Sequence, residues 1–204
     1  MNYVKHDGTN KQVIFTLHGT GGSATDLFSI AQAISPQATL IGFQGEVYEQ
    51  QMARYFARHL DGSFDLRSLA KATYDLRDSL NDVIEKFNLK DHQIILLGYS
   101  NGANLALSYF KEFSNVPIDV ALLYHPTTVR PKDQLQPQNR LHVLMTSGQQ
   151  DPYMKPRQLE QIKQEFENAQ IPLEVFVHPL GHQLVQEELE ASKSFLDKHD
   201  QTTL

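Results

Sequence analysis

The sequence predicts an α/β fold: a mostly parallel sheet of six to seven strands with helices on both faces. Short apolar runs rich in β-branched residues alternate along the 204-residue chain with longer amphipathic segments. The short runs are apolar at nearly every position, which is typical of strands buried on both faces of a parallel sheet. The longer segments carry apolar residues three, four and seven apart, which is typical of helices. No repeat, linker or low-complexity segment interrupts the pattern, so we expect one domain over residues 1–204.

The strands are expected where the apolar runs occur. Six runs qualify, at residues 13–17, 39–41, 94–97, 120–123, 143–145 and 175–177. Tyr3 and Val4 could add a weak strand at one edge of the sheet. A proline-containing loop separates the fourth run from the fifth, and helical segments separate most of the others, as parallel neighbours require.

The helices are expected between and after these strands. One is predicted near residues 24–34 and others at residues 103–113, from Pro156 onward, and after the last strand. A long helix is predicted after Asp65, and its buried face should consist of Leu69, Leu76, Leu80, Val83 and Phe87. Residues 42–64 show neither a helical nor a strand period, and we expect an irregular stretch there.

The composition excludes several classes of function. Hydrophobic residues make up 40% of the chain and charged residues 21%, as in an ordinary globular protein. The formal net charge is −6 and no basic cluster occurs, which argues against a nucleic-acid partner. No run approaches the roughly 18 apolar residues of a membrane span, and the first residues lack the apolar core of a signal peptide, so a cytoplasmic location is expected. The absence of cysteine excludes disulfides, thiolate metal ligands and a cysteine nucleophile.

A motif for nucleophilic chemistry follows the predicted strand at residues 94–97. Residues 98–102 read Gly-Tyr-Ser-Asn-Gly and lead into a predicted helix. A serine on a sharp turn between strand and helix projects its hydroxyl above the sheet, and small residues two positions away let the two elements pass closely. The helix N-terminus behind it favours negative charge. A glycine-rich turn with an idle serine is the alternative, but the place between a buried strand and a helix favours Ser100 as a nucleophile.

Two residues that such a serine needs follow later strands. Asp151 comes after the strand at residues 143–145, where a carboxylate can orient a histidine, although an ordinary turn residue is the alternative. His182 comes after the last strand and can take the proton from Ser100 and return it to a leaving group. Loops after parallel strands meet at one edge of the sheet, so we expect the three side chains to lie together. Their order along the chain is the order expected of α/β-hydrolases.

A glycine-rich turn follows the strand at residues 13–17. Residues 18–22 read His-Gly-Thr-Gly-Gly, and such a turn frees backbone N–H groups to bind an anion. The turn lacks the Gly-Lys-Ser/Thr ending of a phosphate loop and the Gly-x-Gly-x-x-Gly spacing of a dinucleotide site. We therefore predict an oxyanion hole made by the backbone N–H groups of Thr20 and Asn101, and we expect no cofactor.

These loops resemble those of the phospholipase/carboxylesterase family of α/β-hydrolases, small esterases without a cap domain. The resemblance rests on residues 17–22, 98–103, 148–152 and 181–182. The Ser-Asn-Gly-Ala segment within it is similar to that of bacterial carboxylesterases described as hydroquinone-associated hydrolases, and residues 45–56 resemble a further stretch of that subgroup. The resemblance implies an α/β-hydrolase fold with no cap domain, and the same roles for Ser100, Asp151, His182, Thr20 and Asn101.

Three further residues are candidates for binding the substrate. His125 ends the strand at residues 120–123 on the same edge of the sheet, and a structural histidine is the alternative. Tyr55 and Phe56, in the irregular stretch, could form a wall of the pocket or pack in the core.

Histidines and glutamates near the C-terminus are expected to have no role in the site beyond His182. His178 and His182 have the spacing of a helical metal pair, but a proline and a glycine between them argue against a helix, so no metal site is expected. Glu187, Glu188 and Glu190 are expected on the solvated face of the last helix.

Together these features predict a serine carboxylesterase that hydrolyses short- to medium-chain carboxylic esters, or thioesters, through an acyl-enzyme on Ser100. The expected partner is a small-molecule ester, and the sequence leaves open whether the chain forms a homodimer. A non-catalytic binding protein with the α/β-hydrolase fold is one alternative, and the complete set of candidate residues argues against it. A quinol-linked oxidoreductase or dioxygenase is another, and the lack of a flavin, nicotinamide or iron-binding pattern argues against it.

Overall fold

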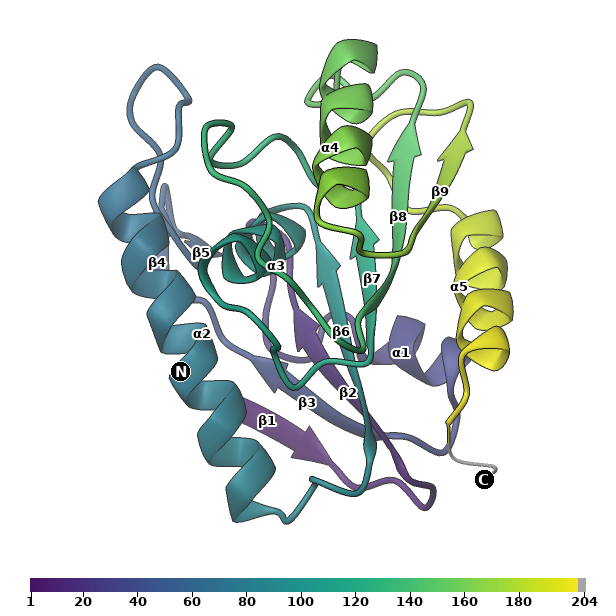
Figure 1. Ribbon diagram of the computed structural model, residues 1–204. Coiled ribbons are helices and arrows are strands. Elements are labelled where there is room, and N and C mark those ends of the chain that lie inside the picture. The colour runs from purple at the N-terminus through teal and green to yellow at the C-terminus, as the bar shows by residue number, and fades with distance from the viewer. Residues whose placement is uncertain (202–204) are drawn as a thin grey trace.

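A seven-stranded sheet runs through the centre of the computed structural model, which describes residues 1–201 (Figure 1). Its strands are β1 (Tyr3–His6), β2 (Gln12–Leu17), β3 (Thr39–Phe43), β6 (Gln93–Tyr99), β7 (Val120–Tyr124), β8 (His142–Gly148) and β9 (Leu173–His178). In space they follow the order β1-β3-β2-β6-β7-β8-β9, and within this sheet only β1 is antiparallel to its neighbour. The prediction of a mostly parallel sheet of six to seven strands is confirmed, and the weak edge strand is β1.

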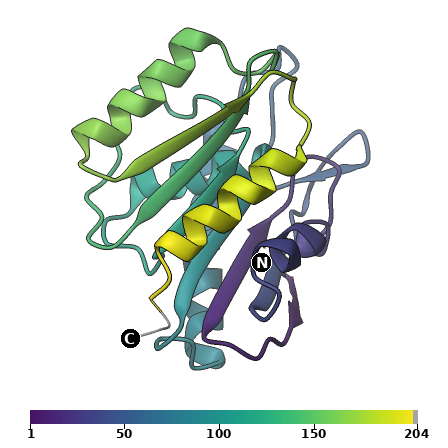
Figure 2. The same cartoon turned by 90° about the vertical axis from the view of Figure 1, so that its right-hand side faces the viewer.

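Helices cover both faces of this sheet. Within residues 1–201 they are α1 (Phe28–Ile34), α2 (Leu66–Lys86), α3 (Asn101–Glu112), α4 (Pro156–Asn168) and α5 (Gln186–Lys198). Figure 1 shows α2, α3 and α4 on one face, and Figure 2 shows α1 and α5 on the other. The part of the chain that the structure describes contains no inserted cap domain, as expected. None of its helices is both long enough and apolar enough to cross a membrane.

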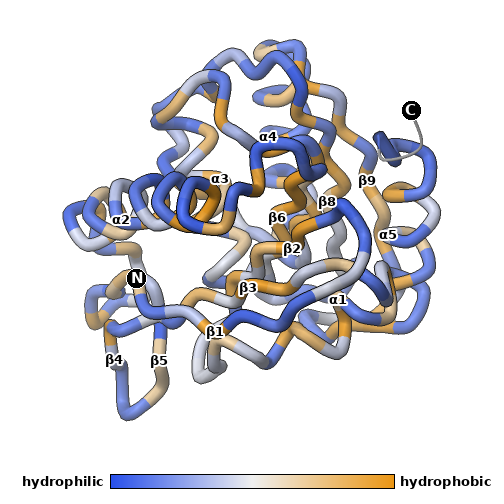
Figure 3. Tube along the Cα trace, turned by 90° about the horizontal axis from the view of Figure 1, so that it is seen from below, coloured by the Kyte–Doolittle hydropathy of each residue, from blue (hydrophilic) through white to orange (hydrophobic). Residues whose placement is uncertain are grey.

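The strands separate two apolar cores. In β2, Val13 and Phe15 belong to the core beneath α2, α3 and α4, whereas Ile14 belongs to the core beneath α1 and α5. Successive strand residues point to opposite faces, so a strand that is covered on both faces is apolar at nearly every position. Figure 3 shows the result, with hydrophobic colours along β2, β6 and β8 and hydrophilic colours on the outer turns of α2 and α5.

The helix predicted near residues 24–34 begins later than expected, at Phe28. The preceding residues form turns, in which Asp26 N–H donates to Ser23 O (3.2 Å) and Phe28 N–H to Thr25 O (3.0 Å). The side chains of Ser23 and Asp26 also bond to each other, as short polar side chains do in competition with a helix. The apolar residues of this segment are buried without being helical.

The stretch over residues 42–64, predicted as irregular, contains a hairpin. Its strands are β4 (Val47–Glu49) and β5 (Met52–Arg54), which pair antiparallel. Gln50 and Gln51 join them with φ of 48° and 68°, as in a two-residue turn with both φ positive. Strands of three residues are too short to show a period, and the turn lacks the usual glycine or asparagine, so no sequence pattern indicates the hairpin.

Candidate active site

Ser100 lies on a strained turn between β6 and α3. Its φ is 50° and its ψ is −109°, a conformation that costs roughly 1–3 kcal/mol and persists only where the surroundings impose it. A glycine two residues before Ser100 and another two residues after it let the turn lie close to neighbouring backbone atoms. A Cβ on Gly102 would stand 2.1 Å from Leu17 O, and a Cβ on Gly98 would stand 2.8 Å from Ala103 N. The turn therefore presents the Ser100 side chain at the carboxyl edge of the sheet.

The structure brings together the three residues that the sequence predicts as a catalytic triad. His182 Nε2 lies 2.8 Å from Ser100 Oγ, and His182 Nδ1 lies 2.7 Å from Asp151 Oδ2. Asp151 comes from the loop after β8 and His182 from the loop after β9. A carboxylate accepts only, so Nδ1 carries the proton of a neutral ring and Nε2 is free to accept the hydroxyl proton. This geometry suits proton transfer from serine to histidine.

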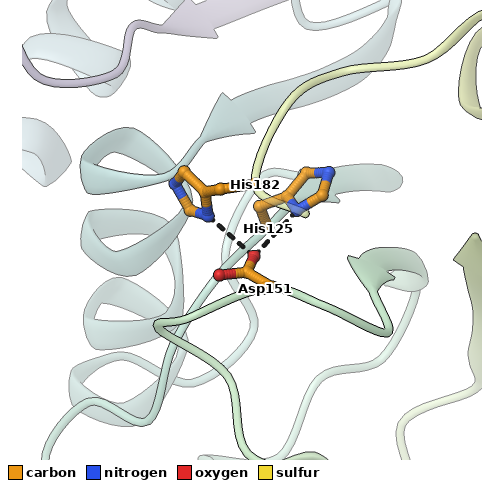
Figure 4. A group of neighbouring side chains, drawn as sticks. All are labelled: His125, Asp151 and His182. Atoms are coloured by element: carbon orange, nitrogen blue, oxygen red, sulfur yellow. Dashed lines mark hydrogen bonds and ion pairs between the residues drawn. The ribbon is translucent and has the colours of Figure 1, made fainter. Parts of the chain in front are cut away.

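Asp151 is held as an ionised carboxylate. Its Oδ1 accepts from Tyr153 N–H (2.9 Å), and its Oδ2 lies within reach of two histidines, His182 at 2.7 Å and His125 at 3.0 Å (Figure 4). Burial works against ionisation, but the hydrogen bonds from His182 and His125 outweigh it and hold the pKa of Asp151 below its ordinary range. The negative charge can therefore stabilise a positive His182 during turnover.

Two tyrosines that the sequence did not single out fix the His182 ring. Tyr99 Oη donates to the backbone carbonyl of His182 (2.7 Å), and the two rings lie 5.6 Å apart. On the other side the Tyr153 ring meets His182 edge-on at 4.8 Å. Tyr99 could have been found from its position next to Ser100 in the sequence. Tyr153 could have been found only from its position two residues after Asp151.

The predicted oxyanion hole is formed by two segments next to Ser100. Thr20 and Asn101 both line the cavity over Ser100. Within residues 1–201, neither backbone N–H donates to another protein group. The glycine-rich turn is held in place because Gly21 N–H donates to Ala53 O (2.8 Å) and Arg54 Nη1 donates to Thr20 Oγ1 (2.6 Å). Both N–H groups are thus available to a negatively charged oxygen.

The cavity over Ser100 has a volume of about 560 Å³, within the usual range for a small-molecule site. Its lining combines apolar, polar and cationic side chains: Thr20, Met52, Arg54, Arg58, Gly62, Phe64, Tyr99, Ser100, Asn101, Asn104, Thr127, Tyr153 and His182. The β4–β5 hairpin and the segment after it supply Met52, Arg54 and Arg58. The sequence could have indicated Arg54 and Met52, because they lie in the stretch that resembles the carboxylesterase subgroup.

The two arginines share one carboxylate. Arg58 donates to both oxygens of Glu49, at 2.6 and 3.2 Å, and Arg54 Nε lies 3.5 Å from the same group. Burial, and then the charge of Arg58, lower the pKa of Arg54, while the hydrogen bond to Glu49 raises that of Arg58. The wall of the cavity therefore carries an excess of positive charge.

Tyr55 and Phe56, predicted as pocket residues, do not line this cavity. Tyr55 is 4% exposed; its hydroxyl donates to Phe43 O (2.8 Å) and accepts from His18 N–H (3.0 Å). Its backbone N–H donates to Asn101 Oδ1 (2.8 Å), so Tyr55 joins the glycine-rich turn to the start of α3. Phe56 is fully buried and packs edge-on against a neighbouring phenylalanine. Their backbone belongs to the hairpin region, but their rings point into the core.

His125 also does not line the cavity, although its ring lies 5.2 Å from that of His182. It is fully buried and comes directly after β7, with a φ of 51°. The expectation that Glu188 faces solvent is wrong: Glu188 is fully buried and reaches His125, whereas Glu187 and Glu190 are exposed. The buried face of α5 consists of Glu188, Ser192, Phe195 and Leu196, and a run of acids at the start of the helix does not show which of them lies on that face.

Polar atoms of His125, His178 and Glu188 lie within 4.8 Å of one another, the only such group in residues 1–201 besides the one that includes Asp151 and His182. Two histidines and a carboxylate form a common ligand set. However, Leu180 N–H donates to His178 Nδ1 (3.1 Å), which places the proton of neutral His178 on Nε2, the atom that would face a metal. His125 presents both nitrogens to carboxylates. The hydrogen-bond pattern is therefore that of an ion pair and not of a metal site.

Several known proteins are similar to this chain over nearly its whole length. MhqD of Bacillus subtilis (strain 168), whose name assigns it provisionally as a hydrolase, is 32% identical over 195 residues, which are 96% of this chain and 97% of that protein. The crystal structure of the Bacillus cereus carboxylesterase has a TM-score of 0.92 at 31% identity, and covers 98% of this chain and 95% of that one. The structure of YahD with malic acid has a TM-score of 0.86 at 31% identity, covering 98% and 99%.

The matching family refines the resemblance seen in the sequence. The likeness to small α/β-hydrolase carboxylesterases is confirmed, and the protein is a hydrolase of the carboxylic ester type. The sequence profile that matches, over residues 5–201, is that of the dienelactone hydrolases. The chain therefore belongs to the dienelactone hydrolase family.

Proposed function

We propose that this protein hydrolyses short- to medium-chain carboxylic esters, and thioesters, through an acyl-enzyme on Ser100. The observation that carries the proposal is the continuous chain of contacts from Ser100 through His182 to Asp151, at 2.8 and 2.7 Å, beneath a cavity of about 560 Å³. A serine, a histidine and a carboxylate in this arrangement are the groups that acyl transfer requires.

The first half of the reaction forms the acyl-enzyme. Ser100 Oγ attacks the carbonyl carbon of the ester while its proton passes to His182 Nε2. The carbonyl oxygen becomes negative and is stabilised by the N–H groups of Thr20 and Asn101, at about 3 kcal/mol for each donor. The bond from carbon to the alcohol oxygen then breaks, and the alcohol leaves with the proton of His182.

The second half releases the acid. A water molecule attacks the acyl carbon and gives a proton to His182 Nε2, and the same N–H groups stabilise the second oxyanion. The bond between Ser100 Oγ and the acyl carbon breaks, and Ser100 takes back the proton. Asp151 stays ionised in both halves and stabilises His182 each time that it becomes positive.

The test compares wild type with Ser100→Ala on p-nitrophenyl acetate, butyrate and octanoate. Loss of the nucleophile is expected to lower kcat/KM by at least about 10³-fold on every ester that wild type turns over. A fluorophosphonate should add once, at Ser100, in wild type. Equal rates for the two proteins on all three esters would contradict the proposal.

The charge of the cavity supports substrates that carry a carboxylate away from the scissile ester. Arg54 and Arg58 line the cavity, and among the lining residues of the described chain there is no aspartate or glutamate. An arginine pairs well with a carboxylate in a partly desolvated site. Malic acid, with which YahD was studied, is a ligand of this chemical kind.

A matched pair of substrates tests this preference. Mono-p-nitrophenyl adipate and p-nitrophenyl hexanoate have acyl chains of the same length, and only the first carries a terminal carboxylate. Arg58→Gln is expected to lower kcat/KM for the adipate about tenfold, or 1.4 kcal/mol, and to change that for the hexanoate less than twofold. Arg67→Gln, an exposed arginine outside the cavity, is the control. Equal effects of Arg58→Gln on both esters would refute the preference.

A further inference from the structure

The catalytic carboxylate is attached to a second, buried pair of residues. His125 Nδ1 lies 3.0 Å from Asp151 Oδ2, and His125 Nε2 lies 2.9 Å from Glu188 Oε1. Both side chains are fully buried, and neither lines the cavity. The contacts from Ser100 to His182 and Asp151 thus continue inward to His125 and Glu188.

The contacts determine where the protons lie. A carboxylate oxygen can only accept, so both nitrogens of His125 must carry a proton if both neighbours are ionised. Glu188 is held in the ionised form because its Oε2 accepts from Val185 N–H (2.7 Å) at the start of α5. Asp151 is ionised by its own hydrogen bonds. His125 is therefore an imidazolium between two carboxylates.

Other titratable groups also surround His125. From β9, His178 Nε2 lies 3.4 Å from His125 Nε2 and 3.7 Å from Glu188 Oε2. The remaining titratable neighbours are neutral or triad residues: Tyr99 and His182, whose rings lie 6.1 and 5.2 Å away. Burial lowers the pKa of His125, but the hydrogen bonds that it donates to Glu188 and Asp151 outweigh burial and raise the pKa overall.

We propose that His125 and Glu188 are positioning residues, which hold the Asp151 carboxylate in the orientation and charge state that His182 needs. This inference rests on the proposed hydrolysis at Ser100. His125 contacts the same oxygen of Asp151, Oδ2, as His182 does, and Glu188 keeps His125 positive in a place without solvent. Neither residue touches the substrate or the reacting atoms.

The positive charge of His125 also affects how strongly Asp151 stabilises the protonated form of His182. It opposes the charge of Asp151, so Asp151 stabilises the protonated form of His182 less than an isolated carboxylate would. A base that is too easily protonated is inactive at neutral pH. With His125 neutral or absent, the acid limb of the profile of kcat/KM against pH should therefore move to higher pH.

The first variant is His125→Asn, whose amide can keep one hydrogen bond to Asp151 but carries no charge. With p-nitrophenyl butyrate as substrate, we expect kcat to fall about 10- to 30-fold, KM to stay within twofold, and the acid limb to rise by about 0.5–1 pH unit. Glu188 loses its counter-charge in this variant, so the melting temperature should also fall.

The second comparison uses two glutamates on one turn of α5. Glu188→Gln removes the partner of His125, while Glu187→Gln makes the same chemical change at an exposed position. We expect Glu188→Gln to lower kcat about 5- to 20-fold, whereas Glu187→Gln should match wild type. Dialysis against EDTA should leave the wild-type rate unchanged, and a loss that zinc restores would overturn the ion-pair interpretation.

The double variant His125→Asn/Glu188→Gln separates positioning from mere folding. It leaves no unpaired buried charge, so its melting temperature should recover toward wild type while kcat and the acid limb stay those of His125→Asn. Recovery of kcat and the pH profile together with stability would overturn the proposal, as would a wild-type profile in His125→Asn. If Ser100→Ala were as active as wild type, the proposed function itself would fail; an inactive Ser100→Ala with an unaffected His125→Asn would reject the inference alone.

Discussion

Two histidines bond to one oxygen of Asp151, yet their surroundings differ. His182 is on the cavity side, its side chain 20% exposed, and its far nitrogen reaches Ser100. His125 is on the buried side, and its far nitrogen reaches Glu188. The distances to Oδ2, 2.7 and 3.0 Å, are close to equal.

The two histidines differ in what contacts Nε2, the ring nitrogen that does not bond to Asp151. A hydroxyl can give up a proton to His182, so this ring can cycle between neutral and charged forms. Glu188 can only accept, so it keeps His125 charged. The same residue type at the same carboxylate thus becomes a proton carrier on one side and a fixed cation on the other.

The largest effect is expected on the cavity side. His182→Gln removes the base, and kcat on p-nitrophenyl butyrate should fall by about 10⁴-fold or more. Its melting temperature should change less than that of His125→Asn, because His182 is partly exposed and carries no fixed charge. The two variants together give the test: a larger stability loss in His182→Gln than in His125→Asn would contradict the division of roles.

Asp151→Asn acts on both sides at once. The amide can donate to His182 and favour the wrong tautomer, so kcat should fall by about 10³- to 10⁴-fold. It also leaves His125 with one carboxylate. Adding His125→Asn to Asp151→Asn should then cost less than threefold more in kcat, because the contact through which His125 acts is already lost. A full additional 10-fold loss would show that His125 acts by another route.

Much of this site could be predicted from the sequence, because it follows from strand ends. Ser100, Asp151 and His182 each follow a buried strand, and parallel strands bring such loops to one edge. The buried position of Glu188 beside His125 could not be predicted. Glu188 lies among exposed acids, and only the direction in which α5 meets the sheet shows that it is buried.

The side chains that line the cavity could not be predicted from the sequence either, for a different reason. The β4–β5 hairpin and the segment after it place Arg54 and Arg58 in the cavity wall while Tyr55 points inward. Alternation along a strand depends on its register, and no period within residues 42–64 indicates that register. The expectation for Tyr55 and Phe56 therefore placed the right segment near the site but the wrong side chains in the pocket.

The buried pair should make stability depend on pH in a defined window. Glu188 has a pKa below its ordinary 4.5, and its contribution is lost as pH falls through the lowered value. His125 has a pKa above its ordinary 6.5, and its contribution is lost as pH rises through the raised value. The stability difference between wild type and Glu188→Gln should thus be largest between about pH 4.5 and 6.5. Urea unfolding across pH 4–9 measures it, and a difference that grows steadily up to pH 9 would rule the ion pair out.

A smaller effect is expected where Tyr55 joins the glycine-rich turn to the start of α3. Tyr55→Phe removes the hydroxyl that donates to Phe43 O and accepts from His18 N–H. The free energy of unfolding should fall by about 1–3 kcal/mol, because a buried N–H is left without an acceptor. The rate should fall only a few-fold, since the N–H groups of Thr20 and Asn101 remain. A loss above 100-fold in kcat would show that Tyr55 has a direct part in the chemistry.

The most direct test of the two roles is the protonation state of His125, read by NMR of protein labelled with ¹⁵N-histidine. The His125 signals are assigned by their loss in His125→Asn. We expect both ring nitrogens of His125 to carry protons at pH 7.5, and we expect Glu188→Gln to change this signal while Glu187→Gln does not. An unprotonated Nε2 on His125 at that pH in the wild-type protein would contradict this expectation.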